Sequence, residues 1–228
     1  MSRAVETEVK REVRNGADMR RFAALLPVPS RRLLQLNLYL SFPGAVVLEE
    51  SVRLRLVADE IATPSVDGFV VCEDVLVMAE ILAQLDAKAF LTSKSDRRRN
   101  GDVFAAMEVE QELPTGDALG WLLGQPSRTI TMDAEFGRLR DAICGVRPVV
   151  ECWSLTRRAV HLCVEGLILE LDETCYADGT RDLEVEVEDE RIEAASRLLD
   201  ELAKDAQITL VPQVKSKHAR AMAHARRT

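Results

Sequence analysis

The chain has 228 residues, of which 47% are hydrophobic and 30% are charged, a composition that fits a globular protein with one large domain or two small ones. Its net charge of −8 argues against binding to bulk nucleic acid or to an anionic membrane surface. The five cysteines are widely spaced with no CxxC pair, which excludes a disulfide framework and a thiolate zinc site. Because no apolar run approaches membrane-spanning length and the N-terminus has no apolar signal core, we expect a cytoplasmic protein that does not bind membranes.

Two periodicities divide the chain into expected elements. Alternation of apolar residues predicts strands over Val5–Val13, Arg32–Phe42, Val52–Leu56, Phe90–Ser95, Val103–Leu113, Val149–Leu155, Arg157–Val164, Leu167–Thr174, Arg181–Glu188 and Ile208–Val211. Helical spacing predicts helices over Asp18–Leu26, Glu73–Asp86, a stretch around Trp121, Asp133–Cys144, Glu190–Lys204 and Ser216–Arg226. Asp189 is the expected N-cap of the helix that starts at Glu190. Sequential strands joined by hairpins predict an α+β fold built on an antiparallel sheet of about eight strands.

Several of the expected strands carry charge on one face only. In Glu6-Thr7-Glu8-Val9-Lys10 the charged side chains alternate with Thr7 and Val9, so they share a face. The same pattern recurs in Val52–Leu56, Met107–Glu110 and Leu183–Glu188. These faces either form the wet side of a flat sheet or line the lumen of a closed barrel. The second interpretation is favoured because Arg53 and Arg55 are basic where the other segments are mostly acidic, which suits a polyanion that arrives with a divalent cation.

The order of these motifs resembles a known family. Glu6-Thr7-Glu8-Val9-Lys10 is similar to the N-terminal ExExK signature of the CYTH, or triphosphate tunnel metalloenzyme, family. The motifs that follow in the family's order are Gln35–Tyr39, Arg53-Leu54-Arg55, Lys94, Glu108-Val109-Glu110, Leu169–Thr174, Asp182–Glu186 and Ser216–Ala219. Together they cover nearly the whole chain, and the stretches around Leu169–Thr174 and Ser216–Ala219 look most like those of inorganic triphosphatases.

The resemblance implies one tunnel domain over residues 1–228: an eight-stranded antiparallel closed β-barrel with helices packed outside, and an insertion at about 57–87. It implies Mg²⁺ or Mn²⁺ as cofactor and, by position, catalytic roles for Lys10, Lys94 and Glu8. The implied phosphate ligands are Lys10, Arg53, Arg55, Lys94, Arg157 or Arg158, and Lys217. The implied metal-side carboxylates are Glu6, Glu8, Glu108, Glu110, Asp172, Glu184 and Glu186.

Three local features are open at this point. Ala105 falls where many members of the family carry an arginine. Arg157 and Arg158 are adjacent in a strand, so only one can face the lumen, and the Thr-Arg context favours Arg157. The arginine-rich run Asp96–Asp102 is interpreted as a solvated hairpin turn, and the basic tail from His218 to Arg227 as a solvated helix end.

The resemblance implies divalent-metal-dependent hydrolysis of a triphosphate in the tunnel, with steep metal dependence and an alkaline optimum. Inorganic tripolyphosphate is the first choice of substrate because it needs only the charges already counted. The alternatives are a thiamine triphosphatase, a class IV-type adenylate cyclase and a non-catalytic polyphosphate-binding module. The expected partner is a small-molecule triphosphate and not a nucleic acid, and the sequence leaves the oligomeric state open.

Overall fold

A computed structural model describes residues 2–43, 51–59, 74–125, 130 and 146–225 of the chain. Within these residues nine strands form one antiparallel sheet. The strands are β1 (Ser2–Val13), β2 (Arg31–Ser41), β3 (Ser51–Asp59), β4 (Lys88–Asn100), β5 (Val103–Leu113), β6 (Val149–Leu162), β7 (Ile168–Tyr176), β8 (Arg181–Glu188) and β9 (Leu210–Pro212).

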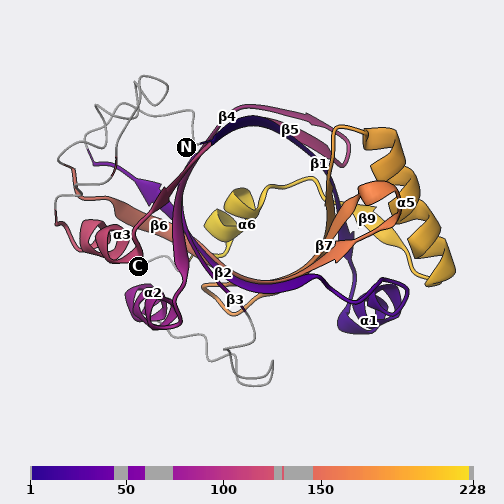
Figure 1. Cartoon of the computed structure of the whole chain (residues 1–228), viewed down its shortest axis with the longest axis horizontal. Coiled ribbons are helices and arrows are strands. Elements are labelled where there is room, and N and C mark those ends of the chain that lie inside the picture. The colour runs from indigo at the N-terminus through magenta and orange to yellow at the C-terminus, as the bar shows by residue number, and fades with distance from the viewer. Residues whose placement is uncertain (1, 44–50, 60–73, 126–129, 131–145, 226–228) are drawn as a thin grey trace.

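Eight of the strands close on themselves into a barrel (Figure 1). Their order around the wall is β5-β4-β3-β2-β6-β7-β8-β1, and β1 also pairs with β5, which closes the ring. Strand β1 pairs with two neighbours: its first part, from Ser2 to Val9, pairs with β5, whereas Glu8–Glu12 pairs with β8. The ninth strand adds a short antiparallel pairing to the end of β1.

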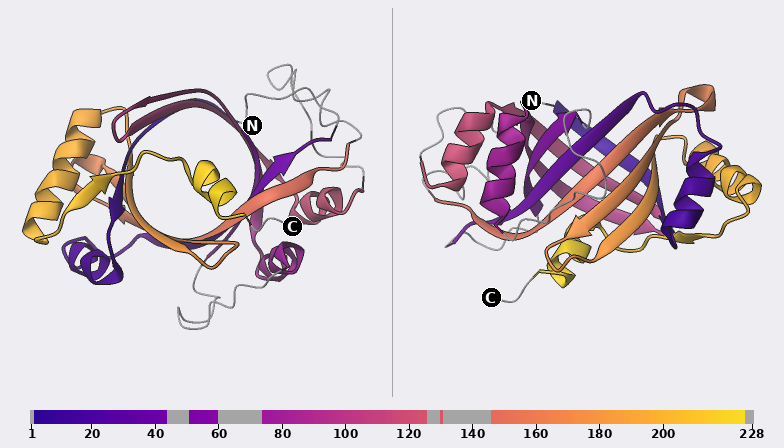
Figure 2. Two further views of the ribbon diagram at one scale, coloured as in Figure 1. Left: turned by 180° about the vertical axis from the view of Figure 1, so that it is seen from behind. Right: turned by 90° about the horizontal axis from the view of Figure 1, so that it is seen from below.

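Four helices cover the outer wall of the barrel (Figures 1 and 2). They are α1 (Gly16–Ala23), α2 (Val75–Gln84), α3 (Thr115–Leu122) and α5 (Ile192–Asp205). The apolar faces of the strands are buried against them in two clusters: α2 and α3 cover one with Leu54 and Leu91, and α1 and α5 cover the other with Val9 and Val185. Because the apolar side chains turn outward to these helices, the alternating polar side chains turn into the lumen.

The remaining helix, α6 (Lys217–Ala223), lies across one opening of the barrel. Figure 1 shows it inside the outline of the ring, and the side view in Figure 2 shows it at one end of the strands. The side-chain oxygen of Ser216 caps the helix by accepting a hydrogen bond from the backbone N–H of Ala219.

The expected fold, an eight-stranded antiparallel closed barrel with helices outside, is confirmed. Several boundaries differ. The two strands expected at 149–164 are one strand, β6, and β4 continues through the arginine-rich run to Asn100, so the turn is confined to Gly101 and Asp102. Asp189 is not the N-cap: α5 begins at Ile192, and the Asp189 carboxylate instead accepts a hydrogen bond from the backbone N–H of Arg191.

Some expectations fall outside the described residues. The helix predicted over Asp133–Cys144 lies there, as does much of the insertion expected at 57–87, although its later part forms α2. In the part of the chain that the structure describes, no helix is long and apolar enough to cross a membrane. Three cysteines in that part, Cys152, Cys163 and Cys175, are free thiols.

Candidate functional site in the barrel lumen

The lumen holds a cavity of about 360 Å³ with an unusually high density of charge. The charged side chains that line it are Glu6, Glu8, Lys10, Arg53, Arg55, Lys94, Arg98, Glu108, Glu110, Arg158, Glu170, Glu186, Glu188 and Lys217. Acids and bases are equally represented in this set, so the lumen is close to neutral overall although the chain carries −8. Thr92, Asn37 and Tyr39 contribute neutral polar surface.

Strand register places opposite charges directly across from each other. Lys10 on β1 is the cross-strand partner of Glu186 on β8, and Lys94 on β4 is the partner of Glu108 on β5. Arg158 on β6 is the partner of Asp172 on β7. Side chains opposite each other in an antiparallel pair are close enough to interact, so the barrel's register itself sets the ion pairs of the lumen.

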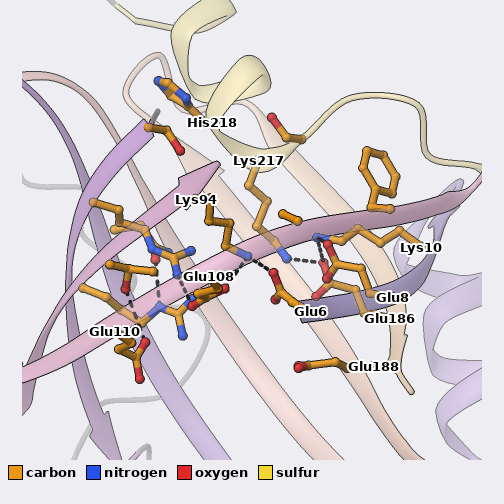
Figure 3. A pocket seen from close by; sticks show the side chains of 18 of the residues that line it. Glu6, Glu8, Lys10, Lys94, Glu108, Glu110, Glu186, Glu188, Lys217 and His218 are labelled. Carbon is orange, nitrogen blue, oxygen red and sulfur yellow. Dashed lines mark hydrogen bonds and ion pairs between the residues drawn. The ribbon is translucent and has the colours of Figure 1, made fainter. Parts of the chain in front are cut away.

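Lys94 joins two carboxylates from different strands (Figure 3). Its ammonium forms an ion pair with Glu6 and lies 2.8 Å from Glu108 Oε2. Burial would raise the pKa of Glu6, but the charge and hydrogen bond of Lys94 outweigh it and lower that pKa to about 2. Glu6 is therefore held ionised in the lumen.

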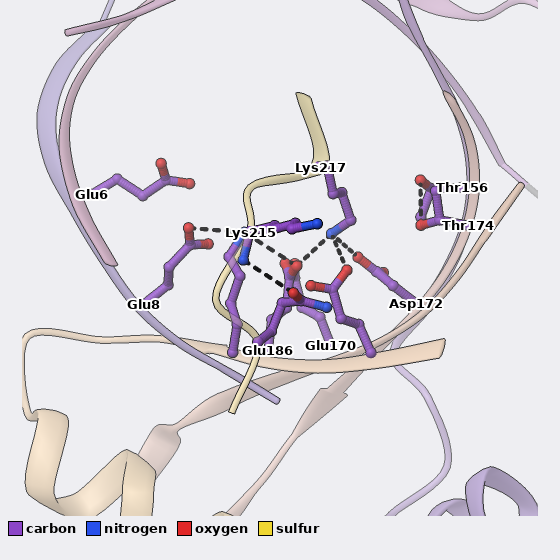
Figure 4. Close-up of polar contacts among 12 residues, drawn as sticks. Glu6, Glu8, Thr156, Glu170, Asp172, Thr174, Glu186, Lys215 and Lys217 are labelled. Atoms are coloured by element: carbon purple, nitrogen blue, oxygen red, sulfur yellow. Dashed lines mark hydrogen bonds and ion pairs between the residues drawn. The ribbon is translucent and has the colours of Figure 1, made fainter. Parts of the chain in front are cut away.

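A second group of cations lies around Lys10, at the end of the Glu6–Lys10 motif of β1 (Figures 3 and 4). Lys10 Nζ lies 2.9 Å from Glu8 and 3.3 Å from Glu186. Lys217, which reaches into the barrel from α6, lies 2.6 Å from Asp172 Oδ2 and also pairs with Glu186. Although burial opposes it, the neighbouring carboxylates raise the pKa of Lys10 and of Lys217 above their ordinary values, so both remain protonated.

Arg53 and Arg55 differ from the other lumen cations because they are poorly compensated. Arg53 Nε and Nη2 are buried without a hydrogen-bond partner, and the nearest carboxylate oxygen, on Glu108, is 3.7 Å from Nη2. Arg55 Nε donates to the side-chain oxygen of Asn37, at 3.3 Å. Burial, with the positive charges of Arg53 and Arg158, lowers the pKa of Arg55 to about 10. Two neighbouring guanidinium groups, one of which has unused donors, can bind an anion.

Glu188 is a lumen carboxylate that forms no ion pair with the described residues. Partial burial and the negative charges of Glu6, Glu170 and Glu8 raise the pKa of Glu188 to about 7. Burial raises the pKa of Glu8 as well. Among the described residues, no three acidic, histidine or cysteine side chains converge to hold a metal ion by themselves. The donor chemistry nevertheless fits Mg²⁺, which prefers hard oxygen ligands and usually takes one or two carboxylates together with substrate oxygens and water.

Most of the residues singled out from the sequence meet in this cavity. Asp172 and Glu184 are exceptions: they are 0% and 1% exposed and do not line it, but lie behind the lining and pair with Lys217. The preference for Arg157 is wrong. Arg158 lines the cavity and bonds both oxygens of Asp172, whereas Arg157 points to the outer side, where Glu173 lies 4.0 Å away.

Five residues of the cavity or of the contacts behind it were not singled out from the sequence: Asn37, Arg98, Glu170, Glu188 and Arg220. Glu170 and Glu188 follow the alternation of their own strands, so the two-residue period, counted from Asp172 and from Glu186, would have found them. Asn37 carries the same signal in β2. Arg98 lines the cavity because β4 extends further than its apolar pattern indicates.

Arg220 contradicts the interpretation of the C-terminal basic residues as a solvated helix end. It is 6% exposed, and its guanidinium donates to Asp182 at 2.8 Å and to Glu184 at 2.6 Å. His218 of the same helix lines the cavity and stacks on Tyr39 of β2, with ring centroids 4.6 Å apart. Ala105, noted above as a departure from the family pattern, also lines the cavity.

Comparison with known proteins finds similarity in structure. No family model matches the chain, and no curated protein does. The chain is similar to the solved structure of a candidate adenylyl cyclase from Hippeastrum for which a dominant triphosphatase activity is described, with a TM-score of 0.75 and 24% identity over 96% of this chain and 95% of that one. It is also similar to a candidate adenylate cyclase from Bacillus halodurans, with a TM-score of 0.62 and 21% identity over 96% of this chain and 98% of that one.

These similarities extend over almost the full length of each chain, so they include the whole barrel and not one hairpin of it. At such identities they establish the fold. The fold of this chain is the closed tunnel barrel that its ordered motifs predict from their resemblance to the CYTH, or triphosphate tunnel metalloenzyme, family.

Proposed function

We propose that the protein is an enzyme that hydrolyses a phosphoanhydride bond of a triphosphate in the barrel lumen with the help of a divalent cation, and that inorganic tripolyphosphate is its substrate. The observation that carries the proposal is the pair Arg53 and Arg55 in the cavity: Arg53 has two hydrogen-bond donors without a partner, and the bond from Arg55 Nε goes to the neutral side chain of Asn37. Burying such charges is costly unless an anion compensates them. The activity described for the Hippeastrum protein of the same fold supports this choice.

The cations of the lumen fall into two groups, according to how fully carboxylates pair with them. Arg53 has two donors free for phosphate oxygens, and the planar forks of Arg53 and Arg55 would fix the register of the chain of phosphates. Lys10, Lys94, Arg158 and Lys217 are each paired with carboxylates and stay charged without substrate. Because their positions are fixed, these cations stabilise the charge that builds up on the transferring phosphoryl group without having to reorganise.

A divalent cation fits the carboxylates of β1 and β8. We assign one or two of Glu6, Glu8 and Glu188 to it, because all three line the cavity, where burial and the neighbouring carboxylates raise the pKa of Glu8 and of Glu188; Glu108, Glu110 and Glu186 border the same cavity. When bound, the cation, Mg²⁺ or Mn²⁺, would supply Lewis-acid stabilisation and lower the pKa of a water molecule. Glu8, which lies beside Lys10, would orient the attacking water by a hydrogen bond and accept its proton.

The proposal is tested by measuring phosphate release from tripolyphosphate with Mg²⁺, with Mn²⁺ and with excess chelator. We expect release only with a divalent cation. Glu8→Gln and Arg53→Gln should each lower kcat/KM by a factor on the order of 10² or more. Arg157→Gln is the matched control, because Arg157 is an arginine of the same barrel that points to the outer side, and it should change kcat/KM by less than about twofold.

Full activity in chelator, or equal losses in Arg53→Gln and Arg157→Gln, would contradict hydrolysis in the lumen. Binding of tripolyphosphate without phosphate release would indicate the non-catalytic binding module. The substrate is tested by presenting tripolyphosphate, ATP and thiamine triphosphate at equal concentration. Cyclic nucleotide and pyrophosphate from ATP, with no phosphate from tripolyphosphate, would indicate the cyclase alternative.

A further inference from the structure

Helix α6 presents two cations to one row of acids on β8. Lys217 and Arg220 are three residues apart and therefore share a face of the helix. Asp182, Glu184 and Glu186 are alternate residues of β8 and therefore share a face of the strand. The helix thus faces the row with Arg220 opposite Asp182 and Glu184, and with Lys217 further into the lumen, where it contacts Glu186 (Figure 4).

Both cations contact the same carboxylate, Glu184. Its Oε2 is 2.6 Å from Arg220 Nη2 and 3.4 Å from Lys217 Nζ, and its side chain is 1% exposed. Water cannot compensate a carboxylate at that depth, so its charge must be balanced by these two side chains. Arg220 makes the shorter contact and is also tied to Asp182, whose carboxylate accepts a hydrogen bond from the Tyr176 hydroxyl at 2.7 Å.

Because Arg220 balances the charge of Glu184, the Lys217 ammonium can be directed toward Asp172 and Glu186. Its ammonium lies 2.6 Å from Asp172 Oδ2 and pairs with Glu186, whose side chain lines the cavity. If Arg220 lost its charge, Lys217 would be the one remaining cation among the described residues that pairs with Glu184, since Lys10 acts on it from beyond ion-pair distance. The ammonium would then be drawn the short remaining distance toward the wall and away from the lumen.

We propose that Arg220 is a positioning residue: by serving as the counter-ion of Glu184 it keeps the Lys217 ammonium in the lumen, where it binds the anionic substrate. This inference rests on the proposed function for the identity of the anion. It also reassigns Glu184, expected from the sequence to be a metal ligand, as the anchor of α6. Arg220 touches no substrate and acts only through Glu184 and Lys217.

The test is a double-mutant cycle on tripolyphosphate binding, measured by calorimetry without divalent cation, so that hydrolysis does not enter. Arg220→Gln should raise the Kd by about tenfold or more, because it leaves a buried carboxylate to compete for Lys217. The double variant Glu184→Gln with Arg220→Gln should recover to within about threefold of the wild type, since no competing charge remains. Arg191→Gln, which removes a surface arginine paired with Asp189, is the matched control and should leave the Kd unchanged.

The cycle separates a positioning role from a merely structural one. If Arg220 only pinned the helix, removing Glu184 as well would not restore binding, and that result would overturn the inference. An unchanged Kd in Arg220→Gln would overturn it too. Should Arg220→Gln not fold, Arg220→Lys keeps the charge and should bind within about threefold of wild type. A Lys variant that folds but binds about tenfold more weakly would count against the inference.

Failure of the proposed function has a different signature. If the wild type binds tripolyphosphate without hydrolysing it, and the cycle shows the recovery, the inference stands and the proposed hydrolysis fails. If the wild type hydrolyses tripolyphosphate and the cycle shows no recovery, the inference alone fails. If the wild type does not bind tripolyphosphate at all, both fail.

Discussion

Arg53 and Arg55 are the residues of the lumen that point most directly to an anionic ligand. Arg53 Nε and Nη2 have no hydrogen-bond partner, with a Glu108 oxygen 3.7 Å from Nη2, and Arg55 Nε donates to the neutral side chain of Asn37. The two positive charges repel each other, which is a cost to the folded protein that a bound anion would offset. Arg158, by contrast, is bonded to Asp172 and Glu186 and pairs with Glu170.

The two kinds of arginine should respond to substitution in opposite ways. Arg55→Met should raise the KM for tripolyphosphate yet leave the free energy of unfolding unchanged or higher by about 1 kcal/mol, because an uncompensated buried charge is removed. Arg158→Met should lower the free energy of unfolding by about 3–5 kcal/mol, because the carboxylates around Arg158 lose their partner. Urea unfolding of both variants without ligand measures the difference. Equal destabilisation would show that Arg55 is compensated after all.

The pH dependence of stability follows from Glu188 and Glu6. The pKa of Glu188 is raised to about 7 in the folded protein, so between its ordinary value of 4.5 and 7 the folded state holds a proton that the unfolded state has lost. The free energy of unfolding therefore falls as pH rises through this window. The pKa of Glu6 is lowered to about 2, so its contribution is present above 4.5 and is lost as pH falls toward 2.

In the absence of divalent cations, Glu188→Gln should be more stable than wild type at pH 8 and should show a smaller loss of stability between pH 5 and pH 8. Because Glu188 is partly exposed, solvent screening limits the gain to about 1 kcal/mol. Urea unfolding at the two pH values tests this. The idea is wrong if the variant and the wild type lose stability in parallel.

The side chains that face the lumen could be predicted from the sequence wherever alternation fixed the phase of a strand. It did so for Glu6, Glu8 and Lys10, whose neighbours Thr7 and Val9 are uncharged. It left Arg157 and Arg158 undecided, because two like residues give no phase. The polar row Ser154 and Thr156, both fully buried on the inner face, continues to Arg158 and carried the answer.

Among the elements, α6 depends most on its surroundings. It has seven residues, and an isolated helix of that length is unstable in water. Its cap at Ser216 and its stacking contacts, His218 on Tyr39 and His224 on Tyr176, hold it over the barrel opening. The position of Lys217 in the lumen therefore depends on local features of a short segment.

Removing the cap should loosen α6 without disturbing the barrel. Ser216→Ala should cost about 1 kcal/mol of local helix stability and raise the KM several-fold, with little change in global unfolding. Ser216→Thr, which keeps the hydroxyl, should restore the KM. Hydrogen exchange of the α6 amides gives the local measurement. Unchanged exchange in Ser216→Ala would show that stacking alone holds the helix.

The periodicity of the sequence predicted elements well where one face is apolar. Strands β2 and β8 and helix α5 fall within about two residues of their expected positions, which is the usual uncertainty of such boundaries. The periodicity failed to predict the end of β4, because Arg97, Arg98 and Arg99 have no apolar alternation. That segment is held by pairing with β5 and by the Arg99 contact to the carbonyl of Val214, which only the folded chain provides.

At the scale of the whole molecule, substrate and metal should stabilise the barrel, because the lumen charges are drawn from nearly every strand of the wall. Tripolyphosphate with Mg²⁺ at 100 times its Kd should raise the free energy of unfolding by about 2.7 kcal/mol. Thermal unfolding with and without the pair of ligands measures it. Orthophosphate at equal concentration is the control and should give a smaller shift. No shift with tripolyphosphate would contradict binding in the lumen.

The closure of the barrel could be inferred only through the ordered motifs. Alternating charge in separate strands is compatible with a flat sheet, and nothing in the pattern of β1 states that it pairs with both β5 and β8. The separation of basic and acidic residues onto different strands favoured a lumen, and the resemblance to the family predicted that the strands close into a barrel. Contacts between residues more than a hundred positions apart, such as Lys10 with Glu186, are beyond local pattern.

Strand β1 has two neighbours from distant parts of the chain, Val103–Glu110 on one side and Glu184–Glu188 on the other. Because β1 precedes β8 in the chain, its residues are synthesised first and must wait for β8 before this pairing can form. Folding dominated by such distant pairings is slow, and a chain that stops before β8 leaves β1 and β7 each with an open edge. Since Glu6, Glu8 and Lys10 belong to this strand, no early intermediate can contain a complete site, and catalytic competence should emerge in the last step of assembly.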